Sequence, residues 1–213
     1  KRGGITTRTT YDPDGRVLAT IRVGADNTGM VRETAAYDTA GGQTSRSDAL
    51  GRTTLFSWSY DFGAGHLTRT TTNPDGGTVI EVFARDGSRL SVSGTAAVPH
   101  TFEYGIDAPG LFVKDISVGR NAANEPTATQ WVKAYTDFTG RTFKTVFADN
   151  ATTQSFYSAA GQLVRQVDPD GVTTLFAYNT LGELETVALD LNGNGTIDYA
   201  GTDRVSRTTS SVA

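Results

Sequence analysis

Cysteine is absent from this 213-residue sequence, which excludes disulfides, thiol catalysis and zinc sites built on thiolates. The chain also has only two histidines, one methionine and, counted along the sequence, four lysines. Its net charge of −4 and its pI near 5.2 argue against a strongly basic nucleic-acid binder. No apolar run approaches the ~20 residues of a membrane span, so we expect no transmembrane segment.

The residues that are abundant favour β-structure. Threonine accounts for 34 residues and glycine for 24. Threonine is β-branched and suits strands, whereas glycine supplies the turns between them. Several short runs alternate apolar and polar residues, as a sheet with one dry face requires, and no stretch shows a helical period. These runs are 17–21, 78–83, 142–147 and 173–178.

An internal repeat dominates the sequence. An aromatic residue is followed by a glycine four or five residues later, and the aromatics recur at intervals of 21 to 31 residues. The series is Tyr11, Tyr37, Tyr60, Phe83, Tyr104, Tyr135, Tyr157, Tyr178 and Tyr199. A second turn lies about half a period later in several copies, at 48–51, 73–76 and 168–171, so each repeat predicts one β-hairpin.

The predicted fold is therefore all-β. Tandem hairpins over 1–213 form a spiralling or strip-like antiparallel sheet that shares an apolar face. We expect the recurring aromatics to be core residues of that face, and an exposed aromatic binding stripe is the alternative. The repeat is weakest at 91–130, where 118–126 is expected to be a long exposed loop. That region is either an insertion in one array or a boundary between two blocks of repeats.

The repeats resemble the YD-repeat (Rhs) family, whose consensus is Tyr-Asp-x-x-Gly-Arg-Leu. The best matches are Tyr11–Leu18, Tyr135–Arg141, Tyr157–Leu163 and Tyr178–Leu184. The resemblance implies a spiralling strip of hairpins, which in the family forms hollow shells around a C-terminal toxin or large cell-surface adhesion structures. This chain is much shorter than the family's closed shells and lacks their self-cleaving segment with its catalytic aspartates.

A calcium-loop-like segment lies at 190–203. It resembles the loops of EF-hand and dockerin type, in which oxygen ligands alternate around a glycine turn. The predicted ligands are Asp190, Asn192, Asn194, Thr196, Asp198 and Asp203. Gly201 stands where such loops carry a bidentate acid, and Asp203 is expected to substitute for it. The alternative is an Asn-Gly hairpin turn that holds no ion.

Little else in the sequence points to catalysis. His66 and His100 have no partner motif, so we predict no catalytic residue and no other cofactor. Paired acids at 12/14, 75 and 168/170 could suggest glycoside hydrolysis, but their Pro-Asp-Gly context explains them as turn residues. The arginines that follow turn glycines, Arg16, Arg52 and Arg141, are expected to pair with turn acids rather than with phosphate.

The predicted function is a non-enzymatic structural module of an exported or cell-surface bacterial assembly, such as a shell, a fibre or an adhesion structure. Its expected partners are other copies of itself or adjoining repeats of a longer chain, with an encapsulated polypeptide or a surface glycan as further candidates. Because the sequence begins Lys1-Arg2 and no apolar signal core follows, we expect a processed product or a piece of a longer protein. A glycan- or receptor-binding module is the main alternative, and a hydrolase using turn aspartates is the minor one.

Overall fold

The computed structural model describes residues 4–120 and 126–208, and every regular element in these ranges is a β-strand. The chain divides into two compact units, Lys1–Thr101 and Phe102–Ala213. The prediction of an all-β array of tandem hairpins is confirmed. In the described ranges no helix is long and apolar enough to cross a membrane.

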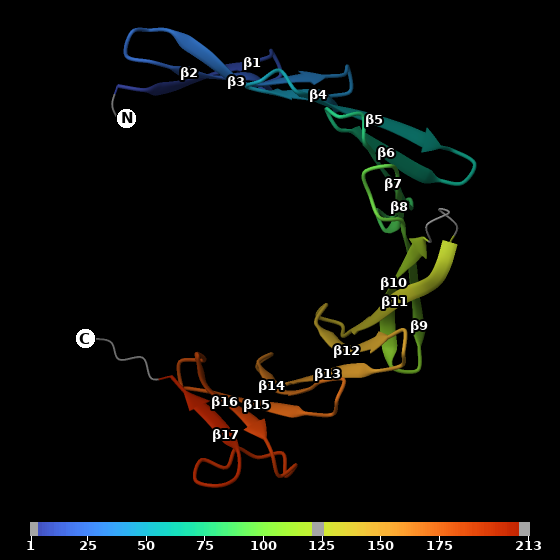
Figure 1. The fold of residues 1–213 in the computed structure, drawn as a ribbon, viewed down its shortest axis with the longest axis vertical. Coiled ribbons are helices and arrows are strands. Elements are labelled where there is room, and N and C mark those ends of the chain that lie inside the picture. The colour runs from blue at the N-terminus through green and yellow to red at the C-terminus, as the bar shows by residue number, and fades with distance from the viewer. Residues whose placement is uncertain (1–3, 121–125, 209–213) are drawn as a thin grey trace. The chain divides into compact units, whose positions relative to one another are not determined.

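The first unit is an antiparallel sheet whose strands pair in chain order (Figure 1). Its strands are β1 (Thr6–Tyr11), β2 (Val17–Val23), β3 (Gly29–Tyr37), β4 (Gln43–Asp48), β5 (Thr53–Asp61), β6 (His66–Thr72), β7 (Thr78–Phe83) and β8 (Arg89–Ser93). The start of β9 (His100–Asp107) pairs with β8. Each strand therefore hydrogen-bonds to strands adjacent to it in the sequence, as expected for hairpins joined by short turns.

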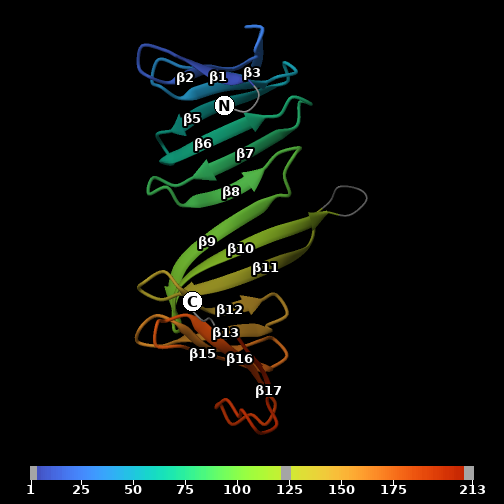
Figure 2. The same ribbon diagram turned by 90° about the vertical axis from the view of Figure 1, so that its left-hand side faces the viewer.

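The second unit follows the same plan (Figure 2). Its strands after β9 are β10 (Gly110–Arg120), β11 (Pro126–Thr136), β12 (Thr142–Phe147), β13 (Thr152–Tyr157), β14 (Leu163–Val167), β15 (Thr173–Tyr178), β16 (Leu184–Asp190) and β17 (Arg204–Arg207). Strands β10 and β11, of 11 residues each, occupy most of the weak-repeat region. The predicted loop over 118–126 is thus shorter than expected, because both of its ends continue strands; residues 121–125 lie outside the described ranges.

One five-residue turn joins most of the strands. In the first copy the Asp12 amide donates to the Arg16 carbonyl (2.9 Å) and the Gly15 amide donates to the Asp12 carbonyl (3.1 Å). The fourth residue has a positive φ, 81° at Gly15, and asparagine takes this role at Asn27 and Asn150. The same pair of bonds recurs at turns starting at residues 12, 24, 38, 48, 73, 84, 137, 147, 158, 168 and 179. Glycine and asparagine spacing therefore sets where each hairpin reverses.

Each unit is a single sheet layer, so few side chains are deeply buried. The buried apolar residues among those described are Tyr135, Leu175 and Ala188. Several aromatics of the repeat are exposed instead, including Tyr11 (59 %) and Tyr199 (62 %). The prediction that the recurring aromatics form one dry core face is wrong for the four that are exposed, Tyr11, Tyr60, Tyr104 and Tyr199, whereas Tyr135 is buried.

Candidate functional site

The repeated turns carry an ion pair that also caps the turn. Asp12 Oδ1 accepts the backbone amides of Asp14 (3.0 Å) and Arg16 (2.8 Å), and Arg16 Nε donates to Asp12 Oδ2 (2.6 Å). The same contacts recur between Asp48 and Arg52 and between Asp137 and Arg141. The prediction that these arginines pair with turn acids is confirmed, and each pair fixes both ends of a turn.

These contacts lower the pKa of the Asp48 and Asp137 carboxyls. The hydrogen bond from the Arg52 guanidinium lowers the pKa of Asp48. The hydroxyl of Thr139 and the amide and guanidinium of Arg141 hold the pKa of Asp137 well below its usual range. Asp48 and Asp137 therefore remain ionised at neutral pH and serve as hydrogen-bond acceptors.

A second contact links successive hairpins at three junctions, through Tyr37, Tyr157 and Tyr178. Tyr37 on β3 donates its hydroxyl to the Val17 carbonyl at the start of β2 (3.0 Å), while the Arg16 guanidinium lies 5.1 Å from the Tyr37 ring centroid. Tyr157 repeats both contacts, with the Thr142 carbonyl (2.9 Å) and Arg141 (4.6 Å). We call this arrangement the inter-hairpin clasp. It explains why the repeat contains tyrosine and arginine: they belong to successive hairpins and meet at their junction.

The third clasp shows which part of the arrangement tolerates change. Tyr178 donates to the Leu163 carbonyl (3.0 Å), although Gln162 stands where the other clasps have arginine. Gln162 Nε2 donates to the Gly182 carbonyl (3.3 Å) in the next turn. The tyrosine-to-carbonyl bond is therefore kept when the stacked cation is lost.

Tyr135 does not occupy the position that the repeat assigns to it. The turn begins at Asp137 rather than at the residue after Tyr135, so Thr136 takes the clasp position. Tyr135 is only 5 % exposed, and its hydroxyl donates to Asp107 Oδ2 (2.9 Å), which also pairs with Lys133. The spacing of aromatics alone could not reveal this one-residue offset.

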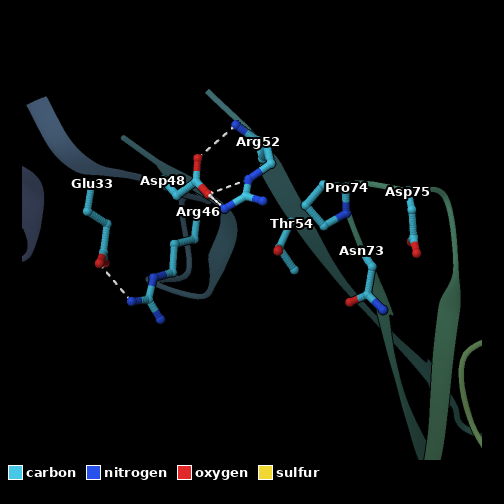
Figure 3. A pocket seen from close by; sticks show the side chains of 8 residues that line it. All are labelled: Glu33, Arg46, Asp48, Arg52, Thr54, Asn73, Pro74 and Asp75. Carbon is cyan, nitrogen blue, oxygen red and sulfur yellow. Dashed lines mark hydrogen bonds and ion pairs between the residues drawn. The ribbon is translucent and has the colours of Figure 1, made fainter. Parts of the chain in front are cut away.

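A depression of about 720 Å³ in the first unit is lined by residues of the turns that start at Asp48 and Asn73 (Figure 3). Two of its acids already form ion pairs: Glu33 pairs with Arg46 (2.7 Å), and Asp48 pairs with Arg52 (2.6 Å). The Asp75 carboxylate accepts the Gly77 amide (2.9 Å). Asp12 and Asp14 likewise share Arg16, and Asp168 caps its own turn. Four of the five turn acids suggested for hydrolysis, Asp12, Asp14, Asp75 and Asp168, are therefore used in turns and ion pairs.

The six residues predicted to bind calcium lie in one hydrogen-bonded loop after β16. Asp190 is buried, and its carboxylate accepts the amides of Gly193 (2.8 Å), Asn194 (3.2 Å) and Gly195 (2.9 Å). Asp203 closes the loop by accepting the amides of Leu191 (3.2 Å) and Asp198 (3.0 Å). The structure thus brings Asp190, Asp198 and Asp203 into the same loop.

Two asparagine side chains of this loop donate to the same oxygen of Asp198. Asn192 (2.6 Å) and Asn194 (2.9 Å) both donate their amide nitrogens to Asp198 Oδ2, and Thr196 donates to Asn194 Oδ1. These oxygen-bearing side chains are of the type that calcium prefers, but both amides would have to turn their oxygens toward the same point. No group of three or more His, Cys, Asp or Glu side chains suited to a metal occurs in the described ranges. Calcium binding stays a prediction.

An aromatic depression lies on the first unit, at β5–β7. Trp58, Tyr60, Leu67 and Phe83 line a hollow of about 360 Å³ together with Arg85. Trp58 is 48 % exposed and Tyr60 is 39 % exposed. Cross-strand pairing places Tyr60 opposite Leu67 and Leu67 opposite Phe83, so these side chains share one sheet face. Trp58 lines this hollow, whereas the second tryptophan of the sequence, Trp131, lies on β11 in the second unit.

Comparison with known proteins supports the repeat assignment. Residues 157–195 match the model of the RHS Repeat family, so the resemblance drawn from the Tyr-Asp-x-x-Gly-Arg-Leu pattern is confirmed. This stretch contains the clasp between Tyr178 and Leu163. No curated protein matches the sequence.

Solved structures of Tc toxin components share the fold. A TcdB2-TccC3-Cdc42 chain is 19 % identical with a TM-score of 0.52, covering 93 % of this chain and 12 % of its own length. A TcdB2-TccC3-TEV chain is 12 % identical with a TM-score of 0.55, covering 88 % and 10 %. A chain of the Photorhabdus luminescens Tc holotoxin pore is 19 % identical with a TM-score of 0.50, covering 88 % and 12 %. The chain thus spans about a tenth of the length of these proteins.

Proposed function

We propose that this chain is a non-enzymatic structural module, in which clasped hairpins form part of the wall of an exported bacterial assembly such as a shell. The observation that carries the proposal is the inter-hairpin clasp, repeated at Tyr37, Tyr157 and Tyr178. Its contacts join one hairpin to the next and leave both sheet faces largely uncovered. An element built this way suits a wall better than a compact domain with an enclosed site.

The comparisons support the same proposal. The chain carries an RHS repeat, and its fold resembles that of chains from Tc toxin complexes, including a holotoxin pore. We propose adjoining repeats of a longer chain as its main partners, with further copies of itself as a second set. In the YD-repeat family such walls surround a polypeptide, so we also propose an enclosed polypeptide as a partner.

Electron microscopy combined with light scattering tests this proposal. The natural full-length protein should form closed shells or extended walls in which these hairpins lie in the wall. The isolated chain should associate through its end strands, because open strand edges accept further strands. A full-length protein in which this segment forms a separate compact body would contradict the proposal.

A glycan- or receptor-binding role is a second candidate, and the aromatic depression favours it. A concave apolar hollow edged by a cationic side chain is a common form of ligand site. A glycan screen with the wild-type chain, a Trp58→Ala variant and a Trp131→Ala control tests it. Glycan binding lost only with Trp58→Ala in a monomeric chain would favour this role over the wall.

A further inference from the structure

Three lysines of the second unit share one sheet face. Three of the chain's four lysines, Lys114, Lys133 and Lys144, lie on the neighbouring strands β10, β11 and β12. Cross-strand pairing places Lys114 opposite Lys133, and Tyr135 opposite Lys144. Because directly paired residues and alternate residues of a strand point to the same side, these lysines share a face.

The same face continues onto β13 and β14. Lys144 pairs with Gln154, and Phe156, two residues further along β13, pairs with Arg165. Arg165 therefore extends the row of cations across five strands. With strands about 4.8 Å apart, the row is about 19 Å long.

Each cation of this row lies within 6.0 Å of the centroid of an aromatic ring. Lys114 Nζ is 5.0 Å from the Trp131 centroid, and Lys133 Nζ is 3.6 Å from that of Phe112. Lys144 Nζ is 6.0 Å from the ring of Tyr135, and the Arg165 guanidinium is 3.7 Å from the ring of Phe156. We call this set of cations and rings the cation–aromatic row. The rings hold the cations in place, so less conformational entropy is lost when a ligand binds.

Two of the four cations, Lys114 and Lys133, form ion pairs with carboxylates. Lys114 lies 3.5 Å from Glu103, and Lys133 pairs with Asp107. No ion pair of Lys144 or Arg165 with a carboxylate occurs in the described part of the chain. Lys144 instead borders a depression of about 410 Å³ with Gln154 and Phe156. Lys144 and Arg165 thus have no ion pair in the described ranges, although the charge of Lys144 also acts on the Asp107 carboxylate from a longer distance. Residues 102–213 as a whole have eight Lys and Arg against thirteen Asp and Glu, a net charge of −5.

We propose that the cation–aromatic row is a docking surface for an acidic, extended polypeptide segment. The charge complementarity is direct, because carboxylates would pair with the Lys144 ammonium and the Arg165 guanidinium. The stacked cations cover the ring faces that a sugar would need for stacking, which argues against a polysaccharide as the occupant. An extended strand rises about 3.3 Å per residue, so about six residues would span the row. This inference deepens the proposed wall function by giving a chemical character to the polypeptide that the wall would contact.

Fluorescence polarisation with a labelled 12-residue poly-L-glutamate tests the proposal on the intact chain. We expect binding at low salt that weakens steeply as sodium chloride is raised, because exposed charges are screened. The double variant Lys144→Gln with Arg165→Gln should weaken binding about 10-fold. A matched control, Arg22→Gln with Arg32→Gln, removes two cations from the first unit and should change binding less than about 2-fold. Circular dichroism checks that both variants keep the β-sheet spectrum.

Four outcomes would overturn the proposal, three of them comparative. These are equal binding of a poly-L-glutamine peptide, equal losses in the two double variants, and tighter binding of a uronic-acid oligosaccharide than of poly-glutamate. Absence of poly-glutamate binding at low salt would count equally against it. None of these results bears on whether the full-length protein forms a wall in electron micrographs, so failure of the docking surface and failure of the wall are distinguishable.

Discussion

Replacement of Tyr178 by phenylalanine removes a single inter-hairpin hydrogen bond and leaves the ring in place. The Tyr178 hydroxyl donates to the Leu163 carbonyl across β14 and β15 at 3.0 Å, in a half-buried position. A neutral hydrogen bond of this kind contributes about 1 kcal/mol to the free energy of unfolding. With a urea dependence of about 1–3 kcal/mol per molar, the midpoint of unfolding should fall by about 0.3–1 M.

The assay is urea denaturation followed by tryptophan fluorescence in a Trp58→Phe background. In that background Trp131, on β11, is the remaining tryptophan, and it lies in the same unit as Tyr178. The matched control is Tyr199→Phe, because Tyr199 is 62 % exposed and its hydroxyl has no hydrogen bond in the described part of the chain. Midpoints for Tyr178→Phe and Tyr199→Phe that agree within about 0.1 M would refute the clasp as a source of stability.

Three further predictions concern the turns and the loop after β16. Gly161→Ala should lower the melting temperature more than Gly171→Ala: both glycines have a φ of 83°, but only at Gly161 would the new Cβ meet a guanidinium nitrogen, at 3.0 Å. The free energy of unfolding should fall in acid as Asp137 is protonated, because the hydrogen bond from the Thr139 hydroxyl lowers the pKa of Asp137 in the folded state. The stability that Asp137 contributes is complete at neutral pH and declines as the pH falls below about 3.8. Asp137→Asn should flatten this acid limb in thermal melts between pH 7 and 2, and an unchanged limb would count against it. Calorimetric titration should detect calcium uptake at millimolar concentrations and its loss in Asp198→Asn; no heat with the wild-type chain would end the calcium hypothesis.

The hairpins could be predicted because their signals are local. Turn positions with a positive φ favour glycine, and the alternation of apolar and polar residues in a strand can be recognised within six residues. Strands β2, β7, β12 and β15 therefore fall on the predicted runs. Burial could not be predicted in the same way. Whether an aromatic such as Tyr11 is covered depends on a second layer, which no local pattern encodes.

The contacts between hairpins were harder to predict than the hairpins themselves. Asp12 and Arg16 lie four residues apart, so their pairing follows from turn geometry. The contact of Arg16 with Tyr37 depends on the register between hairpins, and the spacing of arginine and tyrosine differs between clasps, 21 residues for Arg16 and Tyr37 but 16 for Arg141 and Tyr157. The cation–aromatic row left no trace in the sequence, because Lys114, Lys133 and Arg165 are placed on one face only by the register of five neighbouring strands.

The inter-hairpin clasp has an evolutionary consequence. Each clasp needs only a tyrosine in one hairpin and a backbone carbonyl in the preceding one, as the Gln162 junction demonstrates. Any hairpin that carries the motif can therefore stand beside any other without new contacts being invented. Unequal recombination can add or delete whole units of about 21 residues while every junction stays satisfied. A wall built from such units can grow or shrink by one hairpin at a time while the contacts between its hairpins stay the same.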